Sequence, residues 1–168
     1  KHQPMDIEWA RDGVTAELFI VQARPETIHA PSAGAAHREY RLTKKGAVAL
    51  SGIAVGTRIG AGKVQIIRDT RGIAQFRAAS VLVARMTDPN WEPIMKNAAA
   101  IITEQGGRTS HAAIISRELG IPCVVGAKNA TRALKTGEAV TVDCSSGTVG
   151  IVYRGILPFE ARDISMDA

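Results

Sequence analysis

Aromatic residues are scarce in this sequence: they make up 4% of its 168 residues and offer no stacking platform. Nucleic-acid binding sites commonly combine such platforms with clustered positive charge. The net charge is +5, from 21 Lys and Arg against 16 Asp and Glu, but the basic residues are scattered along the chain. We therefore expect no nucleic-acid partner, since a basic balance is equally typical of a domain that handles phosphorylated ligands.

Cysteine is also scarce, and its two residues, Cys123 and Cys144, cannot build a metal cluster or a disulfide framework. Both lie in apolar, strand-like runs, so we expect buried free thiols. Long hydrophobic runs are absent: no stretch reaches the roughly 20 residues that cross a membrane. No targeting segment precedes the first expected strand. These absences predict a cytoplasmic protein without membrane attachment.

Glycine is plentiful, with 16 residues, and a pair of glycines at 106–107 marks the most distinctive stretch. The apolar run before it, residues 98–102, predicts a buried strand that the glycines end. Ser110 can cap a helix that stops at Gly120. His111 would then lie in the first helical turn, where unpaired backbone N–H groups and the positive end of the helix dipole favour an anion.

A neutral imidazole is a good nucleophile, and histidine ionises close enough to neutral pH to supply it. The nearby helix N-terminus favours the neutral form. Arg108 and the hydroxyl of Thr109, which is the alternative N-cap, add donors at the same place. The pattern fits a phosphoryl carrier better than a general base. A histidine packed at a helix start, or a Gly-Gly turn that only binds an anion, is also compatible with it.

A long ungapped string carries a resemblance to a known family. Residues 106–122 read GGRTSHAAIISRELGIP and are followed by VVG at 124–126. The string resembles the phosphohistidine segment of the PEP-utilising enzymes, which include phosphoenolpyruvate synthases, pyruvate phosphate dikinases, enzyme I of the sugar phosphotransferase system and rifampin phosphotransferases. Two further stretches, 86–95 and 6–13 with 19–27, are similar to the synthase branch. Together the three stretches cover nearly the whole chain.

The resemblance assigns roles to four residues of the glycine loop and helix. It implies that His111 is the phosphohistidine nucleophile and that Gly107 and Arg108 belong to the same catalytic motif, with Arg108 stabilising the carried group. It also implies that Thr109 is the target of a regulatory kinase that removes the phosphate again.

A second candidate site lies near the start of the chain. Residues 5–10 and 17–23 predict two strands joined through an Asp-Gly hairpin turn. With the turn centred near residue 15, Glu8 faces Gln22, and Arg24 projects from the same face. These groups suit a metal ion and the phosphates it bridges, although a solvated face is at least as common.

The resemblance gives this hairpin a place in the whole enzyme. It implies that the hairpin closes an ATP-grasp nucleotide site, where Glu8 and Gln22 hold Mg²⁺ and Arg24 contacts the ATP phosphates. Because the rest of that domain is missing, we expect neither ATP nor Mg²⁺ to bind well to this fragment.

Short β runs separated by glycine-rich turns, alternating irregularly with helices, predict an α/β domain. Strands are expected over residues 63–67, 80–84, 98–103, 122–125, 139–143 and 148–153, and helices over 90–97, 110–119 and 130–135. In the first helix, Trp91 and Met95 are expected in the core. Glycines at 46, 52, 56, 60 and 62 are attributed to turns and bulges.

By resemblance this is a swivelling β/β/α phosphohistidine domain preceded by a β-hairpin from an ATP-grasp domain. The expected division is the hairpin at 1–28, a linker at 29–45, the phosphohistidine domain at 46–153, and a second linker at 154–168. The second linker would lead toward an absent barrel domain. His2, His29 and His37 have no motif around them and are expected to be solvated.

As the resemblance implies, the whole enzyme would convert ATP, pyruvate and water to AMP, phosphoenolpyruvate and phosphate. Its ATP-grasp and pyruvate-binding barrel domains would be partners of this segment, which we expect to be an excised piece, inactive alone. Ser110 replaces the cysteine usual in the synthases, and Cys123 replaces a usual alanine. Both departures keep a pyruvate phosphate dikinase or related phosphotransferase as an alternative, and a stand-alone phosphocarrier or interaction module is the non-enzyme alternative.

Overall fold

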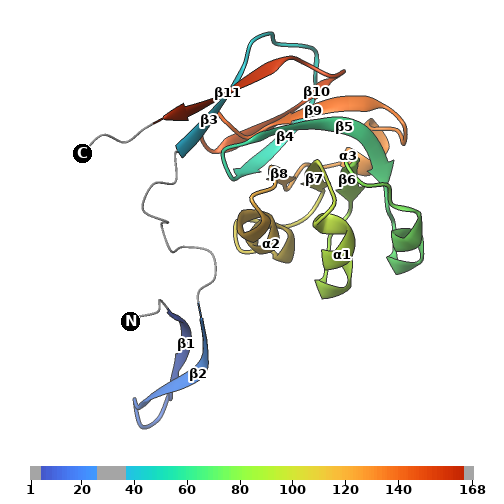
Figure 1. The fold of residues 1–168 in the computed structure, drawn as a ribbon. Helices are drawn as coiled ribbons and strands as arrows, with labels where there is room; N and C mark the ends of the chain where they lie inside the picture. The colour runs from blue at the N-terminus through green and yellow to red at the C-terminus, as the bar shows by residue number, and fades with distance from the viewer. Residues whose placement is uncertain (1–4, 26–36, 165–168) are drawn as a thin grey trace. The chain divides into compact units, whose positions relative to one another are not determined.

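The computed structural model describes residues 5–25 and 37–164. The chain divides into two compact units, Lys1–Ala36 and His37–Ala168. Among the described residues, the first unit contains one hairpin, and the second contains all the other strands and helices (Figure 1).

The first unit is the predicted antiparallel hairpin, built from β1 (Met5–Arg11) and β2 (Leu18–Pro25). Asp12 shapes the turn, because its carboxylate accepts hydrogen bonds from the backbone N–H groups of Val14 (2.8 Å) and Thr15 (2.7 Å). The hydrogen bond from the Thr15 N–H is the main reason why the pKa of the Asp12 carboxyl lies below its ordinary value. The hairpin prediction is confirmed.

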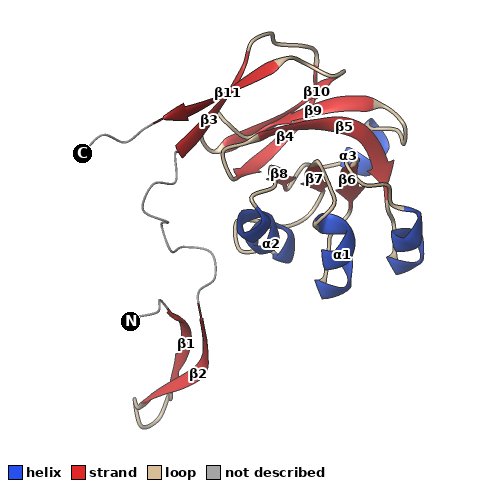
Figure 2. Ribbon diagram, in the orientation of Figure 1, coloured by secondary structure: helices blue, strands red, loops and turns tan. Residues whose placement is uncertain are grey.

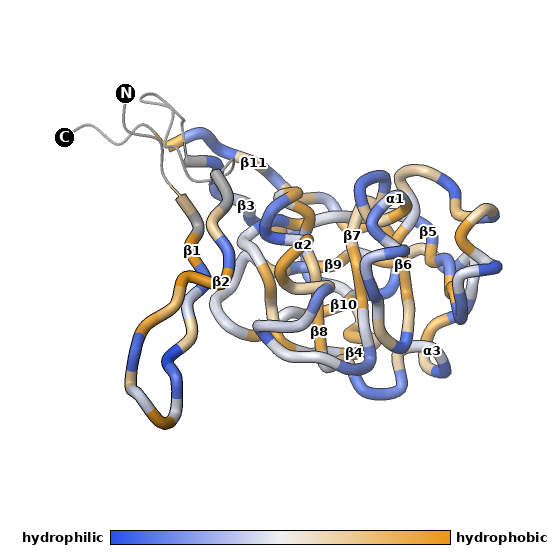
Figure 3. Tube along the Cα trace, turned by 90° about the horizontal axis from the view of Figure 1, so that it is seen from below, coloured by the Kyte–Doolittle hydropathy of each residue, from blue (hydrophilic) through white to orange (hydrophobic). Residues whose placement is uncertain are grey.

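The hairpin exposes apolar side chains from successive positions of β2, and therefore on both of its faces. Apolar segments of the hairpin appear orange in Figure 3. The exposed large hydrophobic residues of the two strands are Met5, Ile7, Trp9, Leu18, Phe19, Ile20 and Val21. Because an isolated two-stranded hairpin is marginally stable at best in water, this unit is suited to packing within a larger domain.

Seven strands of the second unit close into a barrel in the order β10-β4-β8-β7-β6-β5-β9. The strands are β4 (Val48–Val55), β5 (Ile59–Ile66), β6 (Val81–Ala84), β7 (Ala100–Thr103), β8 (Cys123–Val125), β9 (Ala139–Asp143) and β10 (Val149–Arg154). Neighbours from β5 through β8 run parallel, whereas the remaining pairs are antiparallel. The carboxyl ends of four parallel strands therefore meet at one edge.

Helical segments follow these strands, with α1 and α2 on the outer side of β6, β7 and β8 (Figure 2). They are the 3₁₀ turns η1 (Thr70–Gln75) and η2 (Pro89–Trp91) and the helices α1 (Glu92–Met95), α2 (His111–Leu119) and α3 (Ala130–Ala133). None of the helices in the described residues combines the length and apolar character that crossing a membrane requires.

Strand β6 is buried on both faces because it separates two hydrophobic cores. Val81 and Val83 pack in the first core with α3 and the antiparallel strands, whereas Leu82 packs in the second core beneath α1 and α2. Trp91 and Met95 lie in this second core, as predicted. The predicted mixed α/β class is confirmed.

The interpretation of the early glycines as turns and bulges is wrong for three of them. Gly52 lies within β4, and Gly60 and Gly62 lie within β5. An added Cβ would lie 2.2 Å from the Ala99 carbonyl oxygen at Gly60, and 2.6 Å from that of Val125 at Gly52. These strands need glycine because another backbone segment passes directly against them.

Both expected linkers contain a strand that the sequence did not signal. β3 (His37–Leu42) lies within 29–45 and pairs antiparallel with β11 (Phe159–Ile164), which lies within 154–168. Arg38 and Asp163 form an ion pair across this ladder at 2.8 Å. Charged side chains on both faces hide the strand period in the sequence, and the ladder joins the two ends of the unit.

Three predictions about histidines concern atoms that the structure does not describe. His2 and His29 lie outside the described residues, and so does the side chain of His37.

The two cysteines are free and buried, as predicted. The Cys144 thiol donates a hydrogen bond to the Cys123 carbonyl oxygen at 3.3 Å. Burial disfavours the charged thiolate and raises the pKa of Cys123 to about 12 and that of Cys144 to about 11.

We expect these thiols to destabilise the fold at alkaline pH. Above the ordinary thiol pKa of 9.0 the unfolded chain loses two protons that the folded chain retains. Each thiol should therefore lower the free energy of unfolding by about 1.4 kcal/mol per pH unit up to its folded pKa. Urea denaturation across this range checks the slope, with a Cys123→Ala/Cys144→Ala double variant as reference. Equal slopes for the two proteins would contradict the prediction.

Candidate functional site

The glycine loop presents the start of α2 with no capping side chain. Of the two predicted N-cap candidates, Ser110 occupies the N-cap position, in an extended conformation, but its hydroxyl makes no capping hydrogen bond to the helix. Its hydroxyl and its N–H both donate back to the Gly107 carbonyl oxygen, at 2.8 and 3.0 Å. The first N–H bonded to the helix is that of Ile114, so those of residues 111–113 face the open end of this fully described helix. These are the donors that favour an anion.

The far end of α2 is also as predicted. Gly120 adopts a left-handed conformation with φ +65° and donates its N–H to the carbonyl oxygens of Arg117 and Ser116. Glycine tolerates this conformation without strain, and the cap ends the helix.

His111 is the first residue of α2 and is partly exposed. Its Nδ1 lies 3.1 Å from Oγ1 of Thr87, which is 7% exposed and follows β6. A buried hydroxyl thus contacts one ring nitrogen, which leaves Nε2 on the other side of the ring. Sequence reasoning placed His111 correctly but did not select Thr87, although Thr87 lies within the stretch 86–95 that carried part of the resemblance.

Arg108 and Thr109 are exposed, and Gly107 leaves open space where a Cβ would lie. Within the described part of the chain, neither the Arg108 nor the Thr109 side chain makes a hydrogen bond, so both stay available to a ligand. The loop itself is tied down, because Arg117 donates to the Arg108 carbonyl oxygen at 2.7 Å.

Glu92 of α1 gives the site a nearby negative charge. Its pKa is lowered mainly by the hydrogen bond from Lys96, at 2.8 Å, and to a smaller extent by the charge of His111.

The hairpin residues form a separate candidate site in the first unit. Glu8 lies directly opposite Gln22, as predicted, and both side chains are exposed. The side chain of Arg24 lies outside what the structure describes. One carboxylate and one amide oxygen fit part of a Mg²⁺ site that phosphate oxygens and water complete. No group of three or more His, Cys, Asp or Glu side chains suited to a metal occurs among the described residues.

Two family models match the chain, one over the histidine site and one over the hairpin. Residues 76–147 match the mobile domain of PEP-utilising enzymes, and residues 2–44 match the AMP/ATP-binding domain of pyruvate phosphate dikinase. The chain belongs to the PEP-utilising enzyme family. The mobile-domain match contains Thr87, the glycine loop and the whole of α2, so the histidine site lies inside the family's own segment.

Relatives in this family agree over nearly the whole chain. Identity is 52% over 166 residues with phosphoenolpyruvate synthase of Pseudomonas aeruginosa, covering 99% of this chain and 21% of the relative. It is 53% over 165 residues with that of Escherichia coli, covering 98% and 21%. With that of Pyrococcus furiosus it is 51% over 154 residues, covering 92% and 18%. The chain thus spans about a fifth of the length of these relatives.

Proposed function

We propose that His111 is the phosphoryl carrier of a phosphoenolpyruvate synthase, in which ATP, pyruvate and water become AMP, phosphoenolpyruvate and phosphate. The observation that carries the proposal is the placement of His111 at the uncapped start of α2, partly exposed and held by Thr87. The relatives of this chain bear the name of that enzyme.

The hydrogen bond to Thr87 selects the nucleophilic nitrogen. We assign the neutral tautomer in which Nδ1–H donates to the Thr87 hydroxyl oxygen, which leaves the lone pair of Nε2 free. This nitrogen attacks the β-phosphorus of ATP, and the bond from that phosphorus to the bridging oxygen kept by AMP breaks. Water then takes the γ-phosphoryl group, which leaves as orthophosphate, so the β-phosphoryl group remains on Nε2. The enol oxygen of pyruvate then takes the β-phosphoryl group, and the N–P bond breaks.

The phosphoryl group on the His111 ring would be negatively charged, and hydrogen-bond donors near the ring would stabilise it. The N–H groups at the start of α2 would donate to the phosphoryl group, and the exposed Arg108 side chain, three residues before His111, would add further donors. Thr109 is exposed two residues before the partly exposed His111, so its hydroxyl is accessible to a regulatory kinase. We propose Thr109 as that regulatory target.

The hairpin would serve the same reaction from an ATP-grasp domain. Its exposed apolar faces fit burial within such a domain, and residues 2–44 match an AMP/ATP-binding domain. We propose that Glu8 and Gln22 hold Mg²⁺ and that Arg24 contacts the ATP phosphates in the whole enzyme. Bound Mg²⁺ would offset the negative charge of the phosphate oxygens.

Two reaction sites require the carrier to move. We propose that the second unit is the swivelling phosphohistidine domain, which carries His111 between the ATP-grasp domain and the pyruvate-binding barrel. The pairing of β3 with β11 supports motion as one body, because it holds both ends of the unit together.

One feature of the sequence favours a second candidate, pyruvate phosphate dikinase. Ser110 stands where the synthases usually have cysteine. The two enzymes differ in the acceptor of the γ-phosphoryl group, so orthophosphate is released by the synthase and consumed by the dikinase. Following orthophosphate during turnover of the parent enzyme decides between them.

The direct test of the carrier is transfer of label. The 168-residue chain is incubated with the remaining domains of its parent enzyme and with ATP labelled in the β-phosphoryl group. We expect acid-labile label on this chain only when the other domains are present. Label that stays on the other domains throughout turnover would contradict the proposal.

Thr87→Val should slow phosphoryl transfer about 10- to 100-fold, because the imidazole loses the partner that sets its tautomer and orientation. Valine has a similar shape, so folding should be retained. The ¹⁵N shifts of the His111 ring should move toward a mixture of tautomers, and Thr87→Ser should restore both rate and shifts. A Thr87→Val protein with wild-type ring shifts and rate would show that the contact has no positioning role.

A further inference from the structure

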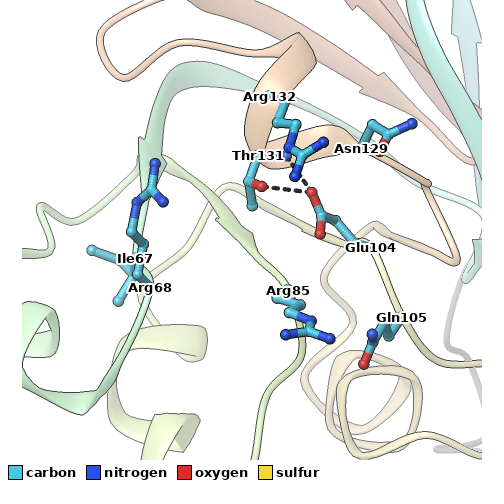
Figure 4. A pocket seen from close by; sticks show the side chains of 8 residues that line it. All are labelled: Ile67, Arg68, Arg85, Glu104, Gln105, Asn129, Thr131 and Arg132. Carbon is cyan, nitrogen blue, oxygen red and sulfur yellow. Dashed lines mark hydrogen bonds between the residues drawn. The ribbon is translucent and has the colours of Figure 1, made fainter.

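A strongly polar pocket lies at the edge where the parallel strands end. Its volume is about 620 Å³. The segments that follow β5, β6 and β7 contribute Ile67, Arg68, Arg85, Glu104 and Gln105, and the start of α3 contributes Asn129, Thr131 and Arg132. Ligands of α/β proteins bind preferentially at such carboxyl edges. Figure 4 shows the three arginines arranged around the pocket.

The pocket has an excess of positive charge that nearby side chains do not neutralise. Within the described part of the chain, no carboxylate forms an ion pair with Arg68, Arg85 or Arg132. Other arginines do have such partners, as Arg38 does with Asp163 and Arg154 does with Glu138. None of the three guanidinium groups around the pocket is therefore in ion-pair contact with a carboxylate of the described residues, although Glu104 also lines the pocket.

The one carboxylate of the pocket is already engaged. Glu104 accepts hydrogen bonds from the N–H (2.8 Å) and the hydroxyl (2.6 Å) of Thr131. The hydroxyl bond is the main cause of its lowered pKa, to which the charges of Arg132 and Arg85 also contribute. Glu104 is thus ionised and bound to α3, and the pocket keeps an excess of two positive charges.

Arg85 is oriented by a neutral group. The side-chain amide oxygen of Gln105, in the orientation that satisfies both residues, accepts from Nε and Nη2 of Arg85 at 3.2 Å each. The backbone N–H of Gln105 also donates to the Arg85 carbonyl oxygen at 2.9 Å. The guanidinium is held in place without losing its charge, which is how a preorganised oxyanion site is built.

We propose that this pocket binds a diphosphate group, either free pyrophosphate or the diphosphate of a nucleotide. Arginine matches phosphate oxygens with paired N–H donors, and three arginines from three segments can contact more than one phosphoryl group. A single orthophosphate would fill only a small part of the volume. His111 is not among the residues that line the pocket, and the proposal does not depend on the carrier function.

The test is calorimetric titration of the 168-residue chain with pyrophosphate, followed in parallel by the ¹H–¹⁵N signals of arginine Nε–H groups. We expect saturable binding at one site with shifts at Arg68, Arg85 and Arg132. An Arg85→Gln/Arg132→Gln double variant should bind at least about tenfold more weakly. All three arginines are exposed, so these changes should leave the fold intact.

Matched controls separate the pocket from general charge attraction. Arg77→Gln removes one exposed positive charge outside the pocket and should bind like the wild type. His111→Asn should also bind normally, so loss of the carrier function does not affect this result. ADP that competes with pyrophosphate would identify a nucleotide diphosphate as a ligand, whereas pyrophosphate alone would identify the free anion. Equal weakening by Arg77→Gln, equal binding of citrate, or no saturable binding would overturn the proposal.

Discussion

His111→Asn should reduce phosphoryl transfer in the full-length enzyme by about 10⁴-fold or more, the scale on which enzymes lose activity without their covalent nucleophile. Asparagine is polar and can still hydrogen-bond to the Thr87 hydroxyl, so the start of α2 should keep its structure. It has no nitrogen able to carry a phosphoryl group. Turnover and label incorporation from ATP both measure the loss.

The same substitution at another histidine is the matched control. His29→Asn should leave turnover and labelling unchanged, because His29 belongs to no recognised motif. Thermal unfolding of both variants shows whether the fold is retained. A His111→Asn enzyme that is stable and still takes up label would remove this histidine from the reaction.

Gly60→Ala should lower the free energy of unfolding by about 3 kcal/mol or more, a large effect for one methyl group. The added Cβ would lie 2.2 Å from the carbonyl oxygen of Ala99 and 2.9 Å from Cγ of Pro122. The first of these atoms belongs to the backbone and cannot turn aside, so β5 must move away from the strands beneath it. Urea denaturation measures the change.

Gly107→Ala is the control for this prediction. Nothing lies within 4 Å of the Cβ that it would add. Its stability should change by no more than about 0.5 kcal/mol, as for other surface substitutions. Equal stability of the Gly60→Ala and Gly107→Ala proteins would show that the close approach of β5 to Ala99 is not a real constraint.

Local signals made part of this structure predictable. The Asp-Gly turn predicted the hairpin, and Glu8 lies opposite Gln22 as expected, although the register shifts by one residue between Glu8 and Trp9. The position of His111 followed from the N-cap at Ser110 and the C-cap at Gly120, which depend only on neighbouring residues. The bounds of α2 were therefore predicted from the sequence to within one residue.

Features that depend on distant partners were not predictable from the sequence. Thr87 contacts His111 across 24 residues, and no spacing rule connects them. Gly52 and Gly60 looked like turn residues because the backbone that passes over them belongs to segments far along the chain.

Charge patterns hid two further features. β3 and β11 carry charged residues on both faces, so neither shows the apolar alternation of a half-buried strand. The arginines of the pocket looked scattered because Arg68, Arg85 and Arg132 follow different elements. Only the parallel arrangement of the strands brings them to one edge.

The most direct test of the account is to locate the phosphoryl group by ¹H–³¹P correlation in the phosphorylated enzyme, with its histidine rings labelled with ¹⁵N. We predict a single phosphorus coupled to the His111 ring through Nε2, with Nδ1 still protonated toward Thr87. Phosphorus on Nδ1, on another histidine, or on the hydroxyl of Thr109 or Ser110 during turnover would contradict the account.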